Sequence, residues 1–169
     1  MDTFDAIATK LESREYSQKQ VPAEVKKKVL EAARLTASGM NYQEWKLILV
    51  QEPSRLKRLA DDSTTGKWVA SANFAVMVLM DQKYNFVMLD AGRVVQDMQL
   101  AAWNFGVSSR IFTGFNNELM TKDFGIPQGF ALTVVVGFGY PAKKVIGRKD
   151  RHPLSEVAFE DRYGQKLKF

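Results

Sequence analysis

The sequence predicts a mixed fold, α+β or α/β, in which helices flank a small and mostly buried sheet. Residues 86–105 carry apolar side chains at helical spacing, as expected of an amphipathic helix. Residues 74–80 form a continuous apolar run, which is typical of a strand buried on both faces. The chain of 169 residues is 46% hydrophobic and 25% charged, so we expect one domain with its own core over residues 1–169.

The first half of the chain alternates between helical and strand patterns. Apolar residues recur at helical spacing over 3–12, and Pro22 before an acidic first turn marks the start of a helix over 22–36. An apolar segment predicts a strand over 45–50, and a short basic helix over 54–60 follows it. This order places the first strand between two helices.

The second half contains the clearest helix of the chain. Eight apolar residues form its stripe: Val87, Ala91, Val94, Val95, Met98, Ala101, Ala102 and Phe105. Asp90 lies off this stripe, and Gly106 would end the helix. Three further elements are expected, namely a strand over 107–112, a helix over 116–124 and a central strand over 131–138.

Composition and sequence context exclude several kinds of site. The chain has no cysteine, which rules out disulfides, thiolate zinc sites, iron–sulfur clusters and a cysteine nucleophile. The single histidine, His152, lies in a charged segment, where an exposed side chain is a better interpretation than a Ser-His-Asp triad. Residues 134–142 superficially fit a dinucleotide fingerprint, but Pro141 interrupts it and no βαβ unit follows.

The N-terminus is acidic and lacks an apolar signal core, and no stretch of the sequence fits a membrane span. We therefore expect a cytoplasmic protein that has no membrane partner. The formal net charge is +5, and residues 143–169 hold 8 basic and 4 acidic side chains. This basic C-terminal extension needs either an anionic partner or a reason not to have one, and the candidate partners are nucleic acid, a membrane surface or a phosphorylated cofactor.

Four segments are more informative together than apart. They are residues 10–16, residues 33–45, residues 108–115, and residues 139–142 continued by 148–154. In this order they resemble the FMN-dependent nitroreductase family over nearly the whole chain. The predicted helix over 86–105 also looks like the family's long central helix.

The stretch from Ser38 to Trp45 is the most specific part of the resemblance. It is similar to the family pattern A-P-S-x-x-N-x-Q-P-W through Ser38, Asn41, Gln43 and Trp45. Ala37 and Glu44 stand where the family has prolines.

The resemblance implies an α+β, nitroreductase-like fold with a central, mostly antiparallel sheet flanked by helices, assembled as a homodimer. Similar proteins bind FMN at the subunit interface, take a hydride from NADH or NADPH, and then reduce nitroaromatics, quinones or similar acceptors. The flavin carries the redox chemistry, while the protein supplies binding, orientation and electrostatics. The sequence leaves open the choice between NADH and NADPH and the physiological acceptor.

The FMN phosphate needs two or more cations arranged as a fork. The resemblance implies this role for Arg14, Lys149 and Arg151. Lys10 stands where the family usually has arginine and is a weaker candidate. Glu12 stands where the family has a serine that helps to hold the phosphate. Because a carboxylate would repel the phosphate, that role is not transferred to Glu12.

The resemblance also implies residues for the isoalloxazine ring. Those expected from the partner subunit are Ser38, Gly39, Asn41 and Gln43, although a helix cap and a turn would favour the same residue types. Lys67 aligns with a lysine near flavin N1 and O2, where a cation stabilises the charge that develops on hydride transfer. Gly114 aligns with a glycine whose backbone N–H faces flavin N5, and Thr113 replaces the glutamate that often precedes it.

The chain departs from many relatives in length. They carry a lid between the strand and the central helix, whereas only residues 81–85 make this connection here. The chain therefore resembles a minimal member with an open site. Within the family, the alternative is a dehalogenase or a flavin-fragmenting enzyme.

Outside enzyme function, the alternatives are an FMN-binding protein without turnover and a basic nucleic-acid-binding protein. The second alternative rests on the net positive charge of the chain. No nucleic-acid recognition motif is visible, so we expect no nucleic-acid partner.

Overall fold

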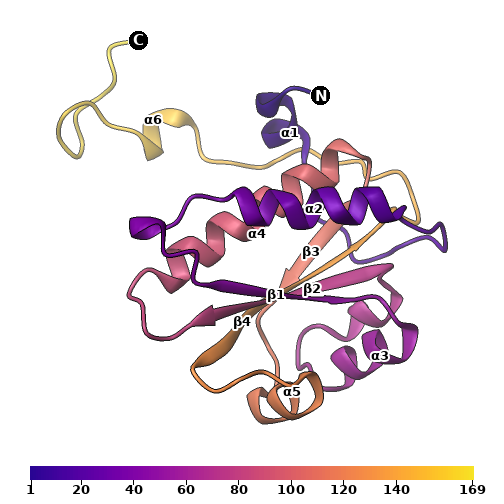
Figure 1. Ribbon diagram of the computed structural model, residues 1–169. Coiled ribbons are helices and arrows are strands. Elements are labelled where there is room, and N and C mark those ends of the chain that lie inside the picture. The colour runs from indigo at the N-terminus through magenta and orange to yellow at the C-terminus, as the bar shows by residue number, and fades with distance from the viewer.

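The computed structural model describes residues 1–169, which build one four-stranded sheet with the strand order β1-β2-β4-β3 (Figure 1). The strands are β1 (Trp45–Val50), β2 (Phe74–Asp81), β3 (Ser108–Phe112) and β4 (Phe130–Gly139). All three neighbouring pairs are antiparallel. The expectation of an α+β fold with an antiparallel central sheet is confirmed.

Helices cover both faces of this sheet. They are α1 (Thr3–Thr9), α2 (Ala23–Leu35), α3 (Pro53–Asp61), α4 (Val87–Asn104), α5 (Asn117–Phe124) and the short α6 (Leu154–Val157). Two 3-10 turns, η1 (Gly39–Asn41) and η2 (Lys67–Ser71), lie in the connections. Figure 1 shows α2 and α4 side by side on one face, with α3 and α5 on the other.

The strand β2 separates the two halves of the core. Its side chains alternate, so that Phe74, Val76 and Val78 pack in the cluster that includes α2 and α4. Ala75 and Met77 pack in the other cluster, with residues of α3 and α5. A strand buried on both faces must be apolar at every position, which explains the continuous apolar run over 74–80.

The pairing of β2 with β4 contains one irregularity. Val78 pairs with Val134, but Leu79 pairs with Leu132, so that Thr133 is an extra residue in β4. Such a bulge bends the strand and increases its local twist.

The first helix is shorter than expected, because α1 ends at Thr9 and not at residue 12. The residues after it run in extended form beside β3, where the Ser13 N–H donates to the Ser109 carbonyl oxygen at 3.2 Å. The hydroxyl group of Tyr16, which is buried, donates to the carbonyl oxygens of Ser13 at 2.8 Å and Gly137 at 3.1 Å. These contacts attach the segment over 10–16 to the edge of the sheet.

The chain after β4 also runs along this side of the molecule. Figure 1 shows it passing α1 before α6, after which the last residues extend away from the sheet and its helices. None of the helices combines the length and the apolar character that a membrane crossing requires.

Candidate functional site

The segment after α1 and the basic C-terminal segment meet in space, although they are far apart in the sequence. The Lys149 ammonium group donates to the carbonyl oxygen of Ile7, in the last turns of α1. Lys10, the residue that caps α1, is only 8% exposed and lies close enough to Lys149 to influence its pKa. Arg151 contributes a third positive charge. The structure therefore brings together three of the four cations predicted for a phosphate.

The electrostatics of this group show an excess of positive charge. Burial lowers the pKa of Lys149, and the charges of Arg151 and Lys10 lower it further. A phosphate dianion would reverse the two charge effects, since an opposite charge favours the protonated ammonium group. We name Lys10, Lys149 and Arg151 the cation cluster.

Glu12 lies beside this cluster and partly neutralises it. Its carboxylate forms an ion pair with Lys10 and accepts a hydrogen bond from Gln99 Nε2 at 3.1 Å. The same Gln99 nitrogen donates to Ser109 Oγ on β3 at 3.0 Å. Lys10 needs such a partner, because a buried ammonium group is rarely left unpaired. Lys10 and Gln99 together therefore fix the position of the Glu12 carboxylate.

Arg14 and Arg110 form the next part of the site. Both residues line two neighbouring cavities of about 280 Å³ each, one of which also includes Lys143 and Lys144. The other cavity includes Thr65, Trp68 and Thr113. Polar and basic residues therefore lie along β3, from Glu12 beside the strand to the loop that follows it.

This loop packs closely against the loop before η2. The Gly114 N–H donates to Thr65 Oγ1 at 3.2 Å, and the Thr64 N–H donates to the Gly114 carbonyl oxygen at 2.8 Å. A Cβ atom at position 114 would lie 2.5 Å from the side-chain oxygens of both threonines. The structure thus gives Gly114 a reason to be glycine that does not involve a ligand.

Lys67 is the first residue of η2 and is exposed. Its ammonium group donates to the carbonyl oxygen of Asp61, the last residue of α3, at 3.0 Å. A cation at this end of a helix satisfies a free carbonyl group and interacts favourably with the helix dipole. Two N–H groups of Lys67 stay available for a ligand.

The second group of predicted residues lies in the turn between α2 and β1. Ser38 Oγ accepts from the Gln43 N–H at 2.9 Å, and Asp90 Oδ2 accepts from the Gly39 N–H at 2.8 Å. Within this turn Met40, Asn41 and Gln43 all have positive φ angles, of 51°, 57° and 52°. Such strained residues persist only where their surroundings hold them, and they concentrate at functional sites.

The turn belongs to a different part of the molecule from the cation cluster. It lies beside the start of α4, where a Cβ atom at Gly39 would come within 2.5 Å of the Phe86 ring. Neither cavity beside Arg14 includes a residue of the 38–43 turn. One chain therefore does not bring its own turn to its own cation cluster, as expected if the turn serves a partner subunit.

The described residues fit a phosphorylated flavin. Lys149, Arg151 and Arg14 offer charged N–H donors for the phosphate, and the pKa of Lys149 is lowered first by burial and then by the neighbouring charges of Arg151 and Lys10. Thr113 borders a cavity in which Ile111 and Phe112 supply an apolar wall. The combination of a cationic end and an apolar end matches an amphipathic cofactor.

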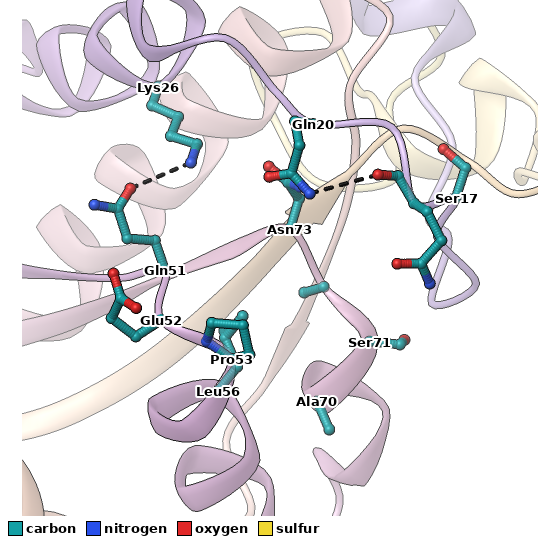
Figure 2. Close-up of a pocket in the computed structure, with 12 residues that line it drawn as sticks. Ser17, Gln20, Lys26, Gln51, Glu52, Pro53, Leu56, Ala70, Ser71 and Asn73 are labelled. Atoms are coloured by element: carbon teal, nitrogen blue, oxygen red, sulfur yellow. Dashed lines mark hydrogen bonds between the residues drawn. The ribbon is translucent and has the colours of Figure 1, made fainter.

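A larger polar cleft lies elsewhere. It has a volume of about 400 Å³, and Figure 2 shows the hydrogen bond of 3.2 Å from Lys26 Nζ to Gln51 Oε1 at its side. Asn73 Oδ1 accepts from the Val21 N–H at 2.9 Å within the same wall. None of the predicted site residues lines this cleft.

The sequence alone predicts no role for several polar residues around the cavities, Glu12 and the 38–43 turn. Arg110 lines both cavities beside Arg14, Thr65 lines one of them, and Gln99 holds Glu12. Asp90, which lies off the apolar stripe of α4, is completely buried. A helical pattern cannot reveal an acidic residue whose partner is a backbone N–H of another segment.

Comparison with known proteins gives a consistent picture. The model of the nitroreductase family matches residues 12–83 and 63–140. A protein from Archaeoglobus fulgidus is 31% identical over 144 residues, which cover 80% of this chain and 83% of that protein. That relative is provisionally named an NADH dehydrogenase/NAD(P)H nitroreductase.

Solved structures share the fold at lower sequence identity. An FMN-dependent nitroreductase from Clostridium difficile R20291 has a TM-score of 0.87 at 18% identity, covering 95% of this chain and 100% of that one. A nitroreductase family protein from Clostridium difficile 630 has a TM-score of 0.83 at 23% identity, covering 96% and 99%. At these identities the similarity establishes the fold alone.

Proposed function

Because this chain belongs to the nitroreductase family, we propose that it is an FMN-dependent NAD(P)H oxidoreductase. The observation that carries the proposal is the cation cluster, which is assembled from the two ends of the chain and has an excess of positive charge. When bound, FMN supplies the redox chemistry, taking a hydride from NADH or NADPH and passing electrons to a nitroaromatic, a quinone or a similar acceptor.

Three cations carry the phosphate end of the site, and Lys149 has two N–H groups left after its contact with the Ile7 carbonyl oxygen. Lys149, Arg151 and Arg14 hold the phosphate through charge-assisted hydrogen bonds. Lys10 contributes less, because its ammonium group is already paired with Glu12.

At the ring end, the protein orients the cofactor and leaves one face open to substrates. The loop with Thr113 and Gly114 supports the edge of the ring, and Lys67 places a cation near the position where negative charge develops. The Gly114 N–H reaches the ring only if the Thr65 hydroxyl group rotates away from it. The role of Gly114 therefore requires a small local change on binding.

The site is completed by a second copy of the chain in a homodimer. Ser38, Gly39, Asn41 and Gln43 of the 38–43 turn would contact the flavin bound mainly by the other subunit. Four apolar side chains beside this turn are exposed: Leu35, Met40, Met88 and Leu89. An exposed apolar patch next to a turn without a ligand supports an interface at this place.

Absorbance spectroscopy of the purified protein tests the proposal. We expect a flavin spectrum after reconstitution with FMN, anaerobic bleaching on addition of NADH or NADPH, and recovery on addition of a nitroaromatic or a quinone. A protein that does not quench FMN fluorescence would contradict the proposal. Flavin that binds but is not bleached by either nucleotide would indicate a flavin-binding protein without turnover.

A further inference from the structure

Glu44, the residue before β1, is a buried acid that lacks a partner. It is only 4% exposed, and both its carboxylate oxygens are buried without a hydrogen bond. Its backbone is anchored, because its carbonyl oxygen accepts from the Asp81 N–H at 2.9 Å. This acid replaces a proline of the family pattern, so the family motif itself does not explain it.

The neighbour of Glu44 on α4 is another buried acid, Asp90. Asp90 is completely buried and uses both its oxygens: Oδ2 accepts from the Gly39 N–H at 2.8 Å, and Oδ1 accepts from Arg93 at 2.9 Å. The charged groups that face Glu44 are thus Asp90 with its partner Arg93 on α4, and Asp81 on β2. The Arg93 side chain is 46% exposed, so its charge is partly solvated.

Two charged carboxylates cannot share a buried place without a proton or a cation. Burial is the main cause that raises the pKa of Glu44, and the charges of Asp90 and Asp81 raise it further, against a lowering by the backbone N–H of Glu44. Asp90, in contrast, already accepts two hydrogen bonds, from the Gly39 N–H and from Arg93. The proton of this pair therefore belongs on Glu44.

We propose that Glu44 is a positioning residue, whose protonated carboxyl group donates a hydrogen bond to the Asp90 carboxylate and so holds Gly39 and the strained 38–43 turn. Loss of that proton places two negative charges side by side. One of the acids then moves toward solvent, and the Gly39 N–H loses its acceptor. Since Met40, Asn41 and Gln43 have positive φ angles, the turn relaxes when this contact is lost.

The consequence for ligand binding rests on the proposed function. If the 38–43 turn contacts the flavin of the partner subunit, then FMN binds best while Glu44 is protonated. FMN affinity should fall as the pH rises through the pKa of Glu44. The hydrogen bond between Glu44 and Asp90 can be tested without flavin, and therefore separately from its effect on FMN binding.

The first experiment compares the apo-protein with its Glu44→Gln variant, which keeps a donor toward Asp90 and cannot ionise. Glu24→Gln, at an exposed position in the first turn of α2, is the matched control. In the wild type the folded state keeps a proton that the unfolded chain has already lost, so stability falls as pH rises above the ordinary glutamate range. As the pH rises above the ordinary glutamate range, the melting temperature should fall in the wild type and in Glu24→Gln. It should fall less in Glu44→Gln.

A spectroscopic signature separates this role from a purely structural one. The chemical shift of the Gly39 amide proton should titrate with Glu44 in the wild type and stay constant in Glu44→Gln. The proposed hydrogen bond between Glu44 and Asp90 would be refuted by either of two results. One is the same pH dependence of the melting temperature in the wild type and Glu44→Gln, and the other is a Gly39 signal that does not titrate.

The second experiment measures the dissociation constant of FMN at a series of pH values, from the ordinary glutamate range upward. We expect about tenfold weaker binding at the upper end for the wild type, as for one unit of pKa coupling, and a smaller change for Glu44→Gln. Equal pH dependence in the two proteins would refute the effect on flavin. Failure of all variants to bind FMN at any pH would refute the proposed function, while the melting profiles would still decide on the acid pair.

Discussion

Lys149 is the residue whose environment most directly indicates an anionic ligand. Its pKa is lowered by burial and by the nearby charges of Arg151 and Lys10. An incoming phosphate favours the protonated form, so FMN binding should take up protons where free Lys149 is partly neutral. FMN affinity should accordingly fall as the pH rises through the pKa of Lys149.

Replacing Lys149 by glutamine should therefore weaken FMN binding by about tenfold or more, as expected for loss of a charge-assisted hydrogen bond. Riboflavin has no phosphate and should bind the variant and the wild type equally. Fluorescence quenching gives both dissociation constants. Lys166→Gln removes a charge from the same basic extension and should change neither value. An equal loss of riboflavin binding would show that Lys149 does not act on the phosphate.

Glu12 gives a second prediction at the scale of one residue, with the opposite sign. Its carboxylate adds negative charge beside the cation cluster and engages Lys10. The Glu12→Ser variant should release Lys10 for the phosphate and tighten FMN binding about three- to fivefold. This corresponds to roughly 0.7–1 kcal/mol, the range for a charge pair that is partly exposed to solvent.

The control for this prediction is Glu15→Ser, which removes an exposed charge three residues away. Titrations with FMN and riboflavin should show a gain that is confined to Glu12→Ser and to the phosphorylated flavin. The variant should also melt at a lower temperature without flavin, because Lys10 is then buried without its partner. Unchanged or weaker FMN binding would mean that Glu12 holds Lys10 in a productive position.

At the scale of elements, the loop after β3 contacts the loop before η2. A Gly114→Ala variant should be destabilised by about 1–3 kcal/mol without any flavin, because the new methyl group meets the side chains of Thr64 and Thr65. Thermal unfolding measures this loss. The double variant Gly114→Ala/Thr65→Ala should recover part of it, because the Thr65 Oγ1 and Cγ2 atoms are removed. Full stability of the single variant would show that these loops move apart freely.

Most elements could be predicted from the sequence because their side chains follow a period. The alternation of core contacts in β2 and the apolar stripe of α4 are direct consequences of burial on two faces and on one face. The predicted end of the first helix at residue 12 is wrong, because α1 ends at Thr9 and Glu12 pairs with Ser109 on a distant strand. Short elements such as η2 and α6 contain too few residues to show a period.

The candidate site could be predicted only in part. A family pattern indicates which residue types occur at each position, and the structure does bring Lys10, Lys149 and Arg151 together. The pairing of Glu12 with Lys10 and the burial of Glu44 and Asp90 depend on contacts between segments far apart in the chain. No local pattern in the sequence carries that information.

At the scale of the whole molecule, the exposed apolar side chains are unevenly placed. Met88 and Leu89 are 71% and 58% exposed and border a cavity of about 530 Å³ together with Thr36 and Ala37. Figure 1 shows this region where α2 ends and α4 begins, next to η1. If a second copy of the chain packed against this region, the 38–43 turn would lie beside the partner. Within one chain, the turn and the cation cluster stay apart.

The Leu89→Glu variant tests this assembly. In a twofold dimer the substitution acts twice, and loss of a buried leucine contact costs roughly 1.5–3 kcal/mol each time, or roughly 3–6 kcal/mol per dimer. We expect the wild type to sediment as a dimer and the variant as a folded monomer whose dimer dissociation constant is raised by at least about a hundredfold. FMN binding should weaken with it, because the turn of the partner is lost.

Leu119→Glu is the matched control, since Leu119 is 42% exposed on α5, on the opposite face of the sheet. It makes the same chemical change and should leave both the dimer and FMN binding intact. Circular dichroism should show native helix content in both variants, so that dissociation is not confused with unfolding. A wild type that sediments as a monomer while saturated with FMN would refute the shared site, because one chain would then supply every contact that the flavin needs.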